Sequence, residues 1–363
     1  MIVVAKIGTS SVTGADGSVD APAVAKLCAE VAAVRSAGHH CVVVSSGAVT
    51  AGVAALRPPG GRPTDATTLQ ALSSIGQHRL MHVYDEAFAS EGLIAGQVLL
   101  APLDFGERRQ YLHARATLER LLELGVVPVV NENDAIADDE IRFGDNDRLA
   151  ALVANLVGAD VLVLLTDTAG LFTADPRRDA TASLVEEVTE IDAELERAAG
   201  GPGTRGGSGG MASKLAAARM AAWSGVRTVI AAAARERVLA GAIACEPGVG
   251  TLIAPRARTL GARKLWIAFA LPSAGRIVVD DGARHALVER EASLLAAGVR
   301  AVEGDFAADD AVEIVGSDGA VFAKGLAGLP SRRSASWVGR NSRDLPPELA
   351  REVVHRDDLV ILV

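Results

Sequence analysis

Short, continuous apolar runs recur along this chain, and they constrain its fold more than any other feature. They occupy residues 2–7, 41–45, 126–130 and 161–166, and VLVLL in the last of them is typical. A strand with one solvent-exposed face alternates apolar and polar residues, whereas an unbroken apolar run indicates a strand that is buried on both faces. Helical patterns separate the runs. The sequence therefore predicts an α/β fold whose mainly parallel, open sheet is sandwiched by helices.

The boundaries of the intervening helices follow from local signals. Asp20 is a candidate N-cap with Pro22 in the first helical turn, and Thr64 or Asp65 can cap a longer helix. The helices expected from such signals run from Asp20 to about Ala37, from Thr64 or Asp65 to about Phe88, over Glu107–Leu124 before Gly125, and over Met211–Trp223; two further strands are expected at Leu93–Leu100 and Thr228–Ala231.

A change in the length and spacing of the expected helices and strands near residue 255 indicates a second domain. The chain has 363 residues, which exceeds the size of one ordinary core. Residues 259–274 are basic and contain proline, as a linker does, and after them short strands alternate with frequent turns. We expect a domain over 1–258, a linker over 259–274, and a small β-rich domain over 275–363 with one helix near Ala283–Ala297.

Composition excludes several classes of protein. The formal net charge of −9 and the aromatic share of 3% disfavour nucleic-acid binding through a general basic surface or through stacking. Three widely spaced cysteines without a CxxC pair indicate neither a disulfide framework nor a zinc site, and His78 with His82 lacks a third metal ligand. The N-terminus lacks signal-peptide features, and no apolar run is long enough to span a bilayer. These patterns predict a cytoplasmic protein.

Polar residues gather where the predicted strands end, and parallel strands bring such ends to one edge of the sheet. Lys6 ends an apolar run and precedes Gly8; Ser45, Ser46 and Gly47 follow the next run; Thr166 and Asp167 follow a third. Gly209 and Gly210 precede the helix that carries Lys214, so that backbone N–H groups and a lysine face the same point. Two lysines with glycine N–H groups suit a phosphoryl group in transfer.

The stretch Asn131–Asp147 holds seven acids and one arginine directly after a predicted strand. Carboxylates there can bind an ammonium group of a substrate or hold lysine side chains charged and oriented. Residues 137–143 show no packing pattern, which fits a lid, an inter-subunit loop or merely solvated acids.

Six motifs, in this order and spacing, give the chain a specific resemblance: KIGTSS, SSGAVTAG, VVPVVNENDAI, FGDNDRLAALVA, LLTDTAGLFTADPR and GGMASKLAAA. With them, residues 1–258 resemble the kinase domain of the glutamate 5-kinase family, within the amino acid kinase superfamily. The tail, which ends in VVHRDDLVIL, resembles the PUA domain that follows this kinase domain in many bacterial members. The resemblance covers essentially the whole chain.

This resemblance implies ATP-dependent phosphorylation of the γ-carboxylate of L-glutamate to γ-glutamyl phosphate, the first step of proline biosynthesis. It implies Mg²⁺ held mainly by the ATP phosphates. The implied partners are L-proline as a feedback inhibitor, γ-glutamyl phosphate reductase, and further copies of the chain in a homo-oligomer. The residues that match the family's site are Lys6, Lys214 and Asp147 for catalysis; Ser46, Gly47, Asn131, Asp134, Asp145 and Asn146 for glutamate; and Lys6, Gly8, Thr166, Asp167, Ser208, Gly209, Gly210, Met211, Ala212, Ser213 and Lys214 for ATP.

Two alternatives stay open at this stage. The chain could be a related acyl-phosphate kinase that acts on aspartate, N-acetylglutamate or carbamate. It could also be an RNA-binding or regulatory protein that uses its C-terminal domain, where Arg332, Arg333, Arg340 and Arg343 are the basic candidates. An acetylated substrate has no α-ammonium group, so Asp134 would be misplaced for it.

Overall fold

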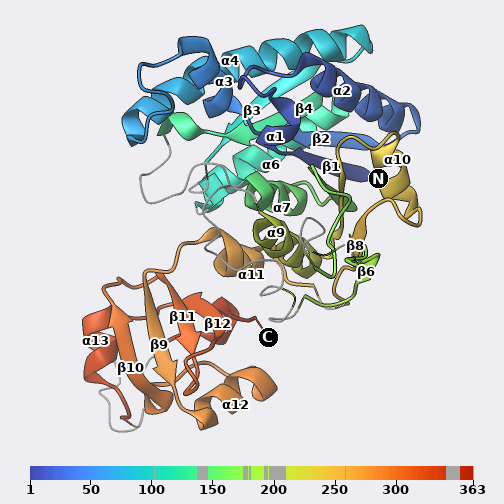
Figure 1. Cartoon of the computed structure of the whole chain (residues 1–363). Coiled ribbons are helices and arrows are strands. Elements are labelled where there is room, and N and C mark those ends of the chain that lie inside the picture. Colours follow the sequence, from blue (N-terminus) through green and yellow to red (C-terminus); the bar gives the residue numbers. More distant parts are fainter. Residues whose placement is uncertain are drawn as a thin grey trace. The chain divides into compact units, whose positions relative to one another are not determined.

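The computed structural model divides the chain into two compact units, Met1–Thr259 and Leu260–Val363 (Figure 1). Each unit has its own buried hydrophobic cluster. The structure describes residues 1–101, 104–105, 107–136, 146–174, 179, 181–191, 195, 210–257, 259–340 and 352–362.

In the described residues, the first unit is built on an eight-stranded sheet. Its strands lie in the order β3-β4-β2-β1-β5-β7-β8-β6. All pairs from β3 to β7 are parallel, whereas β7 and β8 pair antiparallel, so the predicted mainly parallel sheet is confirmed. The strands are β1 Ile2–Ile7, β2 His40–Val44, β3 Ala95–Leu100, β4 Val127–Glu132, β5 Val161–Thr166, β6 Glu187–Val188, β7 Arg227–Ala232 and β8 Thr251–Ile253.

Helices cover both faces of this sheet, as the apolar runs predict (Figure 1). Side chains at alternate positions of the central strands, such as Val3, Ala5 and Ile7, pack against α2, α4 and α10. Their neighbours, such as Val4, are equally buried on the face that α7 and α9 cover. The helices are α1 Thr9–Val12, α2 Ala21–Ser36, α3 Ala48–Leu56, α4 Ala66–Ser90, α6 Arg108–Glu123, the 3₁₀ helix η1 Asp134–Ile136, α7 Asn146–Leu156, α9 Met211–Trp223 and α10 Val238–Ala244.

The helix starts follow the capping chemistry that the sequence indicates. The carboxylate of Asp20 accepts from the backbone N–H of Ala23 at 3.0 Å, and that of Asp65 accepts from Thr68 at 2.9 Å. Strand β3 starts two residues later than expected, at Ala95. The reason is a turn after α4, in which Gly92 has a φ of +70° and Leu93 N–H donates to the carbonyl of Phe88.

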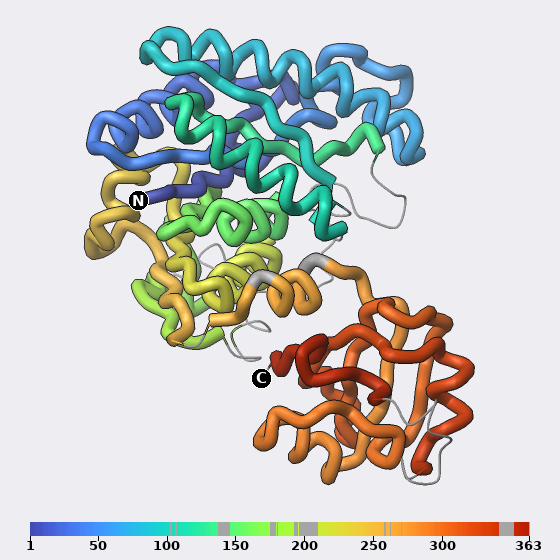
Figure 2. The backbone as a smooth tube through the Cα atoms, turned by 180° about the vertical axis from the view of Figure 1, so that it is seen from behind, coloured from blue at the N-terminus to red at the C-terminus, as the bar shows by residue number. Residues whose placement is uncertain are grey.

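Helices α3 and α4 approach each other at the level of their backbones, and Figure 2 shows them running side by side. A Cβ placed on Gly52 would lie 1.9 Å from the carbonyl oxygen of Leu72, and one on Gly76 would lie 1.7 Å from that of Ala48. Only glycine fits at these two positions. The contact fixes the start of α3, where Gly47, which follows Ser45 and Ser46 after the end of β2, turns the chain with a φ of +104°.

Over its described residues, 260–340 and 352–362, the second unit contains a five-stranded sheet in the order β10-β9-β11-β12-β13, with β9 and β11 parallel and the other pairs antiparallel. The expected helix near 283–297 ends early, at Arg290, because Glu291 adopts a left-handed conformation. The strands are β9 Gly275–Val279, β10 Val299–Gly304, β11 Ala311–Val315, β12 Val321–Leu326 and β13 Leu359–Ile361, and the helices are α12 Asp281–Arg290, η3 Ala296–Gly298, α13 Ser331–Ser336 and η5 Arg356–Asp358.

The segment expected to be a linker has structure of its own. It forms α11 Ala262–Leu265 and a π-helical turn, η2 Trp266–Ala270. Ile267 is fully buried there, in a cluster with Leu326 and Val360 of the second unit. Across the described parts of the chain, no helix is both long and apolar enough to cross a membrane.

Candidate active site

The polar residues singled out by the sequence lie at the carboxyl edge of the first sheet. Strand pairing puts Lys6 of β1 level with Val44 of β2 and Leu164 of β5. Ser45 follows β2, and its backbone N–H donates to the carbonyl of Val130 at 2.9 Å. That bond brings the end of β2 against Asn131 of β4. The neighbours of β1 in the sheet are β2, which follows it in the sequence, and β5, which comes much later. In open α/β sheets such a switch in strand order opens a crevice for ligands.

Two lysines meet on one carboxylate in this crevice. Lys6 Nζ lies 2.6 Å from Asp147 Oδ1, and Lys214 Nζ lies 3.2 Å from Asp147 Oδ2. All three side chains are buried, with exposed fractions of 5% or less for each residue. They come from β1, from the first turn of α7 and from the first turn of α9. The arrangement holds two ammonium groups on opposite oxygens of a single carboxylate.

The charge state of Asp147 follows from these contacts. Burial raises its pKa, but the charges of Lys6 and Lys214 and the hydrogen bonds from Lys6 and Ser213 outweigh burial. The pKa of Asp147 therefore lies below its ordinary value, and the group is ionised near neutral pH. It cannot act as a general base at such a pKa, but it can orient both lysines.

The start of α9 contributes backbone groups and a hydroxyl. Gly210 is the N-cap residue, and no side chain of the described residues caps the helix there. Ser213 Oγ lies 2.7 Å from Asp147 Oδ2 and 2.9 Å from the carbonyl of Gly210. Met211 and Ala212, in the same turn, are half-buried. On the β1 side, Gly8 lies beside the Lys6 ammonium group, since a Cβ there would lie 3.7 Å from Lys6 Nζ.

A chain of side-chain amides lies next to the lysine pair. Asn146 Nδ2 donates to the carbonyl of Ser45 at 2.5 Å and to Asn131 Oδ1 at 2.7 Å. Asn131 Nδ2 donates in turn to Gln77 Oε1 at 2.7 Å. The buried atoms Asn146 Oδ1 and Gln77 Nε2 have no hydrogen-bond partner among the described residues. Buried polar atoms are rarely left unpaired in native proteins, so these two atoms are candidates for ligand contacts.

Asp134 lines a cavity of about 270 Å³ between α4, β3 and the end of β4. Gln77, Gln97 and Glu132 line the same cavity. Burial raises the pKa of Asp134 to about 6. Within the described structure, no group donates a hydrogen bond to this carboxylate. A buried carboxylate of this kind favours a cationic ligand, because such a ligand would offset the cost of its ionisation.

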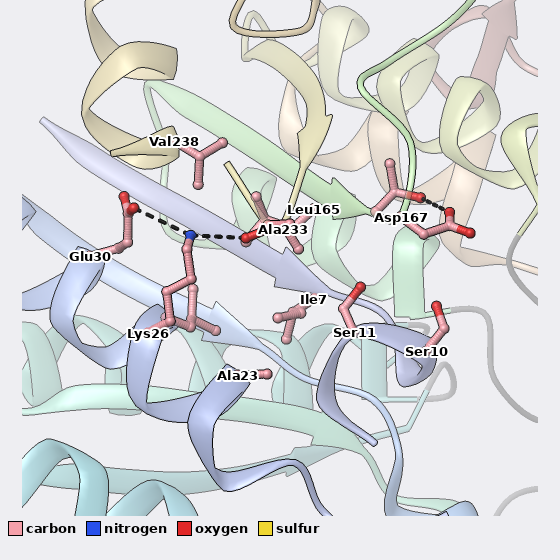
Figure 3. Close-up of a pocket in the computed structure, with 13 residues that line it drawn as sticks. Ile7, Ser10, Ser11, Ala23, Lys26, Glu30, Leu165, Asp167, Ala233 and Val238 are labelled. Atoms are coloured by element: carbon pink, nitrogen blue, oxygen red, sulfur yellow. Dashed lines mark hydrogen bonds and ion pairs between the residues drawn. The ribbon is translucent and has the colours of Figure 1, made fainter. Parts of the chain in front are cut away.

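Thr166 and Asp167 line a different cavity, of about 310 Å³, on the side of α2 and α10 (Figure 3). Thr166 Oγ1 donates to Asp167 Oδ1 at 3.1 Å. Across the cavity, Lys26 Nζ donates to the carbonyl oxygens of Ala233 and Arg235. Lys26 also lies 3.5 Å from Glu30 Oε1, so its charge already has partners within the fold.

The structure thus brings Lys6, Lys214, Asp147, Asn131 and Asn146 into one group. Ser46 is buried next to it, after β2. Asp145, Ser208, Gly209 and the segment 137–143 lie outside the described residues. Within the described residues, no cluster of three His, Cys, Asp or Glu side chains is placed to hold a metal ion.

Sequence reasoning missed Gln77. A signal was available, because α4 carries an apolar stripe at helical spacing that includes Leu69, Leu72, Leu80 and Tyr84. Gln77 lies within this stripe, where an amide costs free energy unless it is hydrogen-bonded. A polar residue on the buried face of a helix beside the site was therefore a candidate.

Comparisons with known proteins bear on this arrangement. The amino acid kinase family matches residues 1–232, and the PUA domain matches residues 275–345. A Pelobacter propionicus protein described as glutamate 5-kinase is 44% identical over 364 residues, covering 99% of this chain and 97% of its own length. Proteins with the same description from Nocardia farcinica and Frankia casuarinae are 46% and 48% identical, again over 99% of this chain and 96% of theirs.

A solved structure shares its fold with most of this chain. An isopentenyl phosphate kinase structure aligns with a TM-score of 0.50 at 18% identity, covering 70% of this chain and all of its own. At this level of identity the likeness concerns the fold alone.

Proposed function

The chain belongs to the amino acid kinase family and carries a C-terminal PUA domain, and on that basis we propose that it is a kinase that phosphorylates the γ-carboxylate of L-glutamate. The product is γ-glutamyl phosphate, formed with ADP in the first step of proline biosynthesis. The observation that carries the proposal is the buried Lys6–Asp147–Lys214 group, in a chain that matches glutamate 5-kinases over 99% of its length.

The proposed reaction needs no general base. The γ-carboxyl group of glutamate has an ordinary pKa of about 4.3, so it is already ionised near neutral pH. One of its oxygens attacks the γ-phosphorus of ATP, the bond from that phosphorus to the bridging oxygen breaks, and ADP leaves. Charge accumulates on the phosphoryl oxygens and on the leaving group, and we assign its stabilisation to Lys6 and Lys214. Asp147 keeps both ammonium groups charged and in place.

The amino acid end of glutamate is assigned to the cavity that Asp134 lines. Glutamate carries one ammonium group and two carboxylates, so an acidic cavity repels most of the molecule. A carboxylate placed against the ammonium group makes such a cavity selective, and Asp134 has no competing partner within the described structure. In the proposed binding mode, Asn146 and Ser46 contact glutamate between this cavity and the lysine pair. Gly47 lets the chain turn beside them.

ATP is assigned to the lysine side of the crevice. The proposed contacts are Gly8, Thr166, Asp167 and the stretch Ser208–Lys214, which precedes and begins α9. A divalent ion accompanies ATP in kinases of this kind, and we propose Mg²⁺. It would be held mainly by phosphate oxygens and would supply further positive charge there. L-proline as a feedback inhibitor, γ-glutamyl phosphate reductase as the recipient of the product, and a homo-oligomer remain proposals that rest on the family resemblance.

Trapping the product tests the proposal directly. The purified chain is incubated with ATP, Mg²⁺ and hydroxylamine, which displaces phosphate from an acyl phosphate to give a hydroxamate. Iron(III) added afterwards turns the hydroxamate into a coloured complex. Glutamate, aspartate and N-acetylglutamate are supplied in parallel, and ADP release is measured beside hydroxamate. Of the three acids, we expect only glutamate to give hydroxamate, and we expect none when ATP is left out. Hydroxamate with N-acetylglutamate or aspartate in place of glutamate would reassign the substrate to the corresponding relative within the superfamily.

A further inference from the structure

In the side-chain amide of Gln77, the oxygen is hydrogen-bonded within the fold, whereas the nitrogen has no partner among the described residues. Gln77 lies in the middle of α4 and is 8% exposed. Its Oε1 accepts from Asn131 Nδ2 at 2.7 Å, whereas its Nε2 is buried and makes no hydrogen bond to any described residue. Gln77 also lines the cavity that contains Asp134.

Two backbone groups determine which way the amides of this chain point. Asn131 Oδ1 accepts from the backbone N–H of Glu132 at 2.8 Å, so the Asn131 amide cannot be turned round without placing two donors together. Its Nδ2 must then find an acceptor, and that acceptor is Gln77 Oε1. In the same way, the carbonyl of Ser45 requires the NH₂ group of Asn146 to face it. The orientation of all three amides follows from main-chain atoms.

This orientation leaves a defined pair of unsatisfied groups. Asn146 uses both hydrogens of its NH₂ group, on Ser45 and Asn131, and its Oδ1 accepts from no group in the described part of the chain. Gln77 Nε2 likewise donates to none of the residues that the structure describes. Glutamate offers one donor group, its α-ammonium, and two acceptors, its carboxylates. An acceptor on the protein can therefore match only the ammonium group, and a donor can match only a carboxylate.

The reacting carboxylate must lie at the lysine pair, which leaves the other carboxylate for Gln77. We propose that Gln77 Nε2 binds the α-carboxylate of the amino acid substrate and makes the enzyme selective for substrates that carry it. This inference rests on the proposed function. Asp134 and Asn146 Oδ1 then receive the α-ammonium group, so that both substituents of the α-carbon are recognised separately.

Two analogues of glutamate separate these contacts. 4-Aminobutyrate keeps the reacting carboxylate and the ammonium group but lacks the α-carboxylate, whereas glutarate keeps both carboxylates and lacks the ammonium group. The KM of glutamate and the inhibition constants of both analogues are measured at saturating ATP for the wild type, Gln77→Met and Asp134→Asn. Gln77→Glu, measured at pH 8, is included because it keeps the oxygen that accepts from Asn131.

We expect a crossed pattern. In Gln77→Met, glutamate and glutarate bind about tenfold or more weakly, as loss of a hydrogen bond to a charged group implies, while 4-aminobutyrate binds within about threefold of the wild type. In Asp134→Asn, glutamate and 4-aminobutyrate weaken instead, and glutarate does not. Gln77→Glu weakens glutamate further, because a carboxylate then faces a carboxylate. The KM of ATP stays within about threefold in the Gln77 variants.

The controls distinguish this inference from a structural role and from the proposed function. Gln110→Met makes the same change at an exposed position of α6 and should leave all constants unchanged. An equal loss of all three ligands in both Gln77 variants, or an unchanged KM for glutamate, would overturn the assignment of Gln77. If the wild type forms no hydroxamate with glutamate, it is the proposed function that fails.

Discussion

At the scale of single residues, the site depends on one carboxylate that holds two lysines. Removing either lysine leaves Asp147 with one charged partner among the described residues and removes one positive charge from the proposed phosphoryl position. Buried charges are expensive unless they are paired, so such a group is built for charge placement rather than for stability.

We expect Lys6→Met and Lys214→Met each to lower turnover by about 10² to 10³, the usual loss for one preorganised transition-state contact. The KM of ATP should change less than turnover. Lys264→Met, in the second unit, is the matched control, and thermal melting shows whether the variants are folded. Turnover close to that of the wild type in either variant would remove that lysine from the proposed phosphoryl site.

Asp134 should make the KM of glutamate depend on pH, and the sign of this dependence follows from its pKa of about 6. Below that pH its carboxyl group is protonated and no longer attracts an ammonium group. We expect the KM of glutamate to rise as pH falls from 8 to 5, while that of ATP stays nearly constant. In Asp134→Asn the KM of glutamate is about tenfold higher at pH 8 and independent of pH over this range. A wild-type profile without this inflection would place the ammonium group elsewhere.

At pH 8, Asp134 should also lower the free energy of unfolding of the ligand-free enzyme. Because the folded-state pKa is raised above the ordinary value of 3.8, Asp134 favours folding below that value, and this contribution is lost as pH rises through about 6. At pH 8, Asp134→Asn should therefore stabilise the ligand-free protein, by on the order of 1–3 kcal/mol. Urea denaturation without substrate measures it. A less stable variant would show that Asp134 has a favourable structural role.

At the scale of elements, the contact between α3 and α4 positions both Gln77 and the start of α3. The two helices meet through glycines rather than through interlocking side chains, so their separation is set by the backbone itself. Residues on one side of the contact are Ala48 and Gly52, and on the other Leu72 and Gly76.

We expect Gly52→Ala to destabilise the protein by about 1–3 kcal/mol, because an added methyl group forces the two backbones apart. The shift also moves Ser46 and Gly47 relative to Gln77, so the KM of glutamate should rise more than that of ATP. Gly261→Ala is the control, since a Cβ there would meet no atom within 4 Å. Equal stability of the two variants would mean that the helices can separate at no cost.

At the scale of the whole molecule, the chain consists of two units with separate cores. All described residues of the candidate site lie in Met1–Thr259. The segment 259–274, which the sequence suggested as a linker, contributes Ile267 to a cluster of the second unit.

A fragment of residues 1–259 should therefore fold and phosphorylate glutamate. For the second unit, a fragment of residues 260–363 should be more stable than one of residues 275–363, because the shorter fragment exposes Leu326 and Val360, which Ile267 covers. Activity assays and thermal melting of the three fragments test both statements. A folded but inactive 1–259 fragment would show that the second unit completes the site, and equal melting temperatures of the two shorter fragments would show that the segment acts only as a linker.

The sequence by itself determined the sheet, its helical cover and the strand ends where polar residues meet. These features depend on local patterns, namely unbroken apolar runs, N-caps such as Asp20, and the rule that parallel strands end at one edge. The tertiary structure alone decided the partners of buried polar groups. Gln77 and Asn131 are 54 positions apart, and no local pattern pairs them. The raised pKa of Asp134 and the packing of Ile267 are likewise long-range, because burial depends on which distant segments fold over a residue.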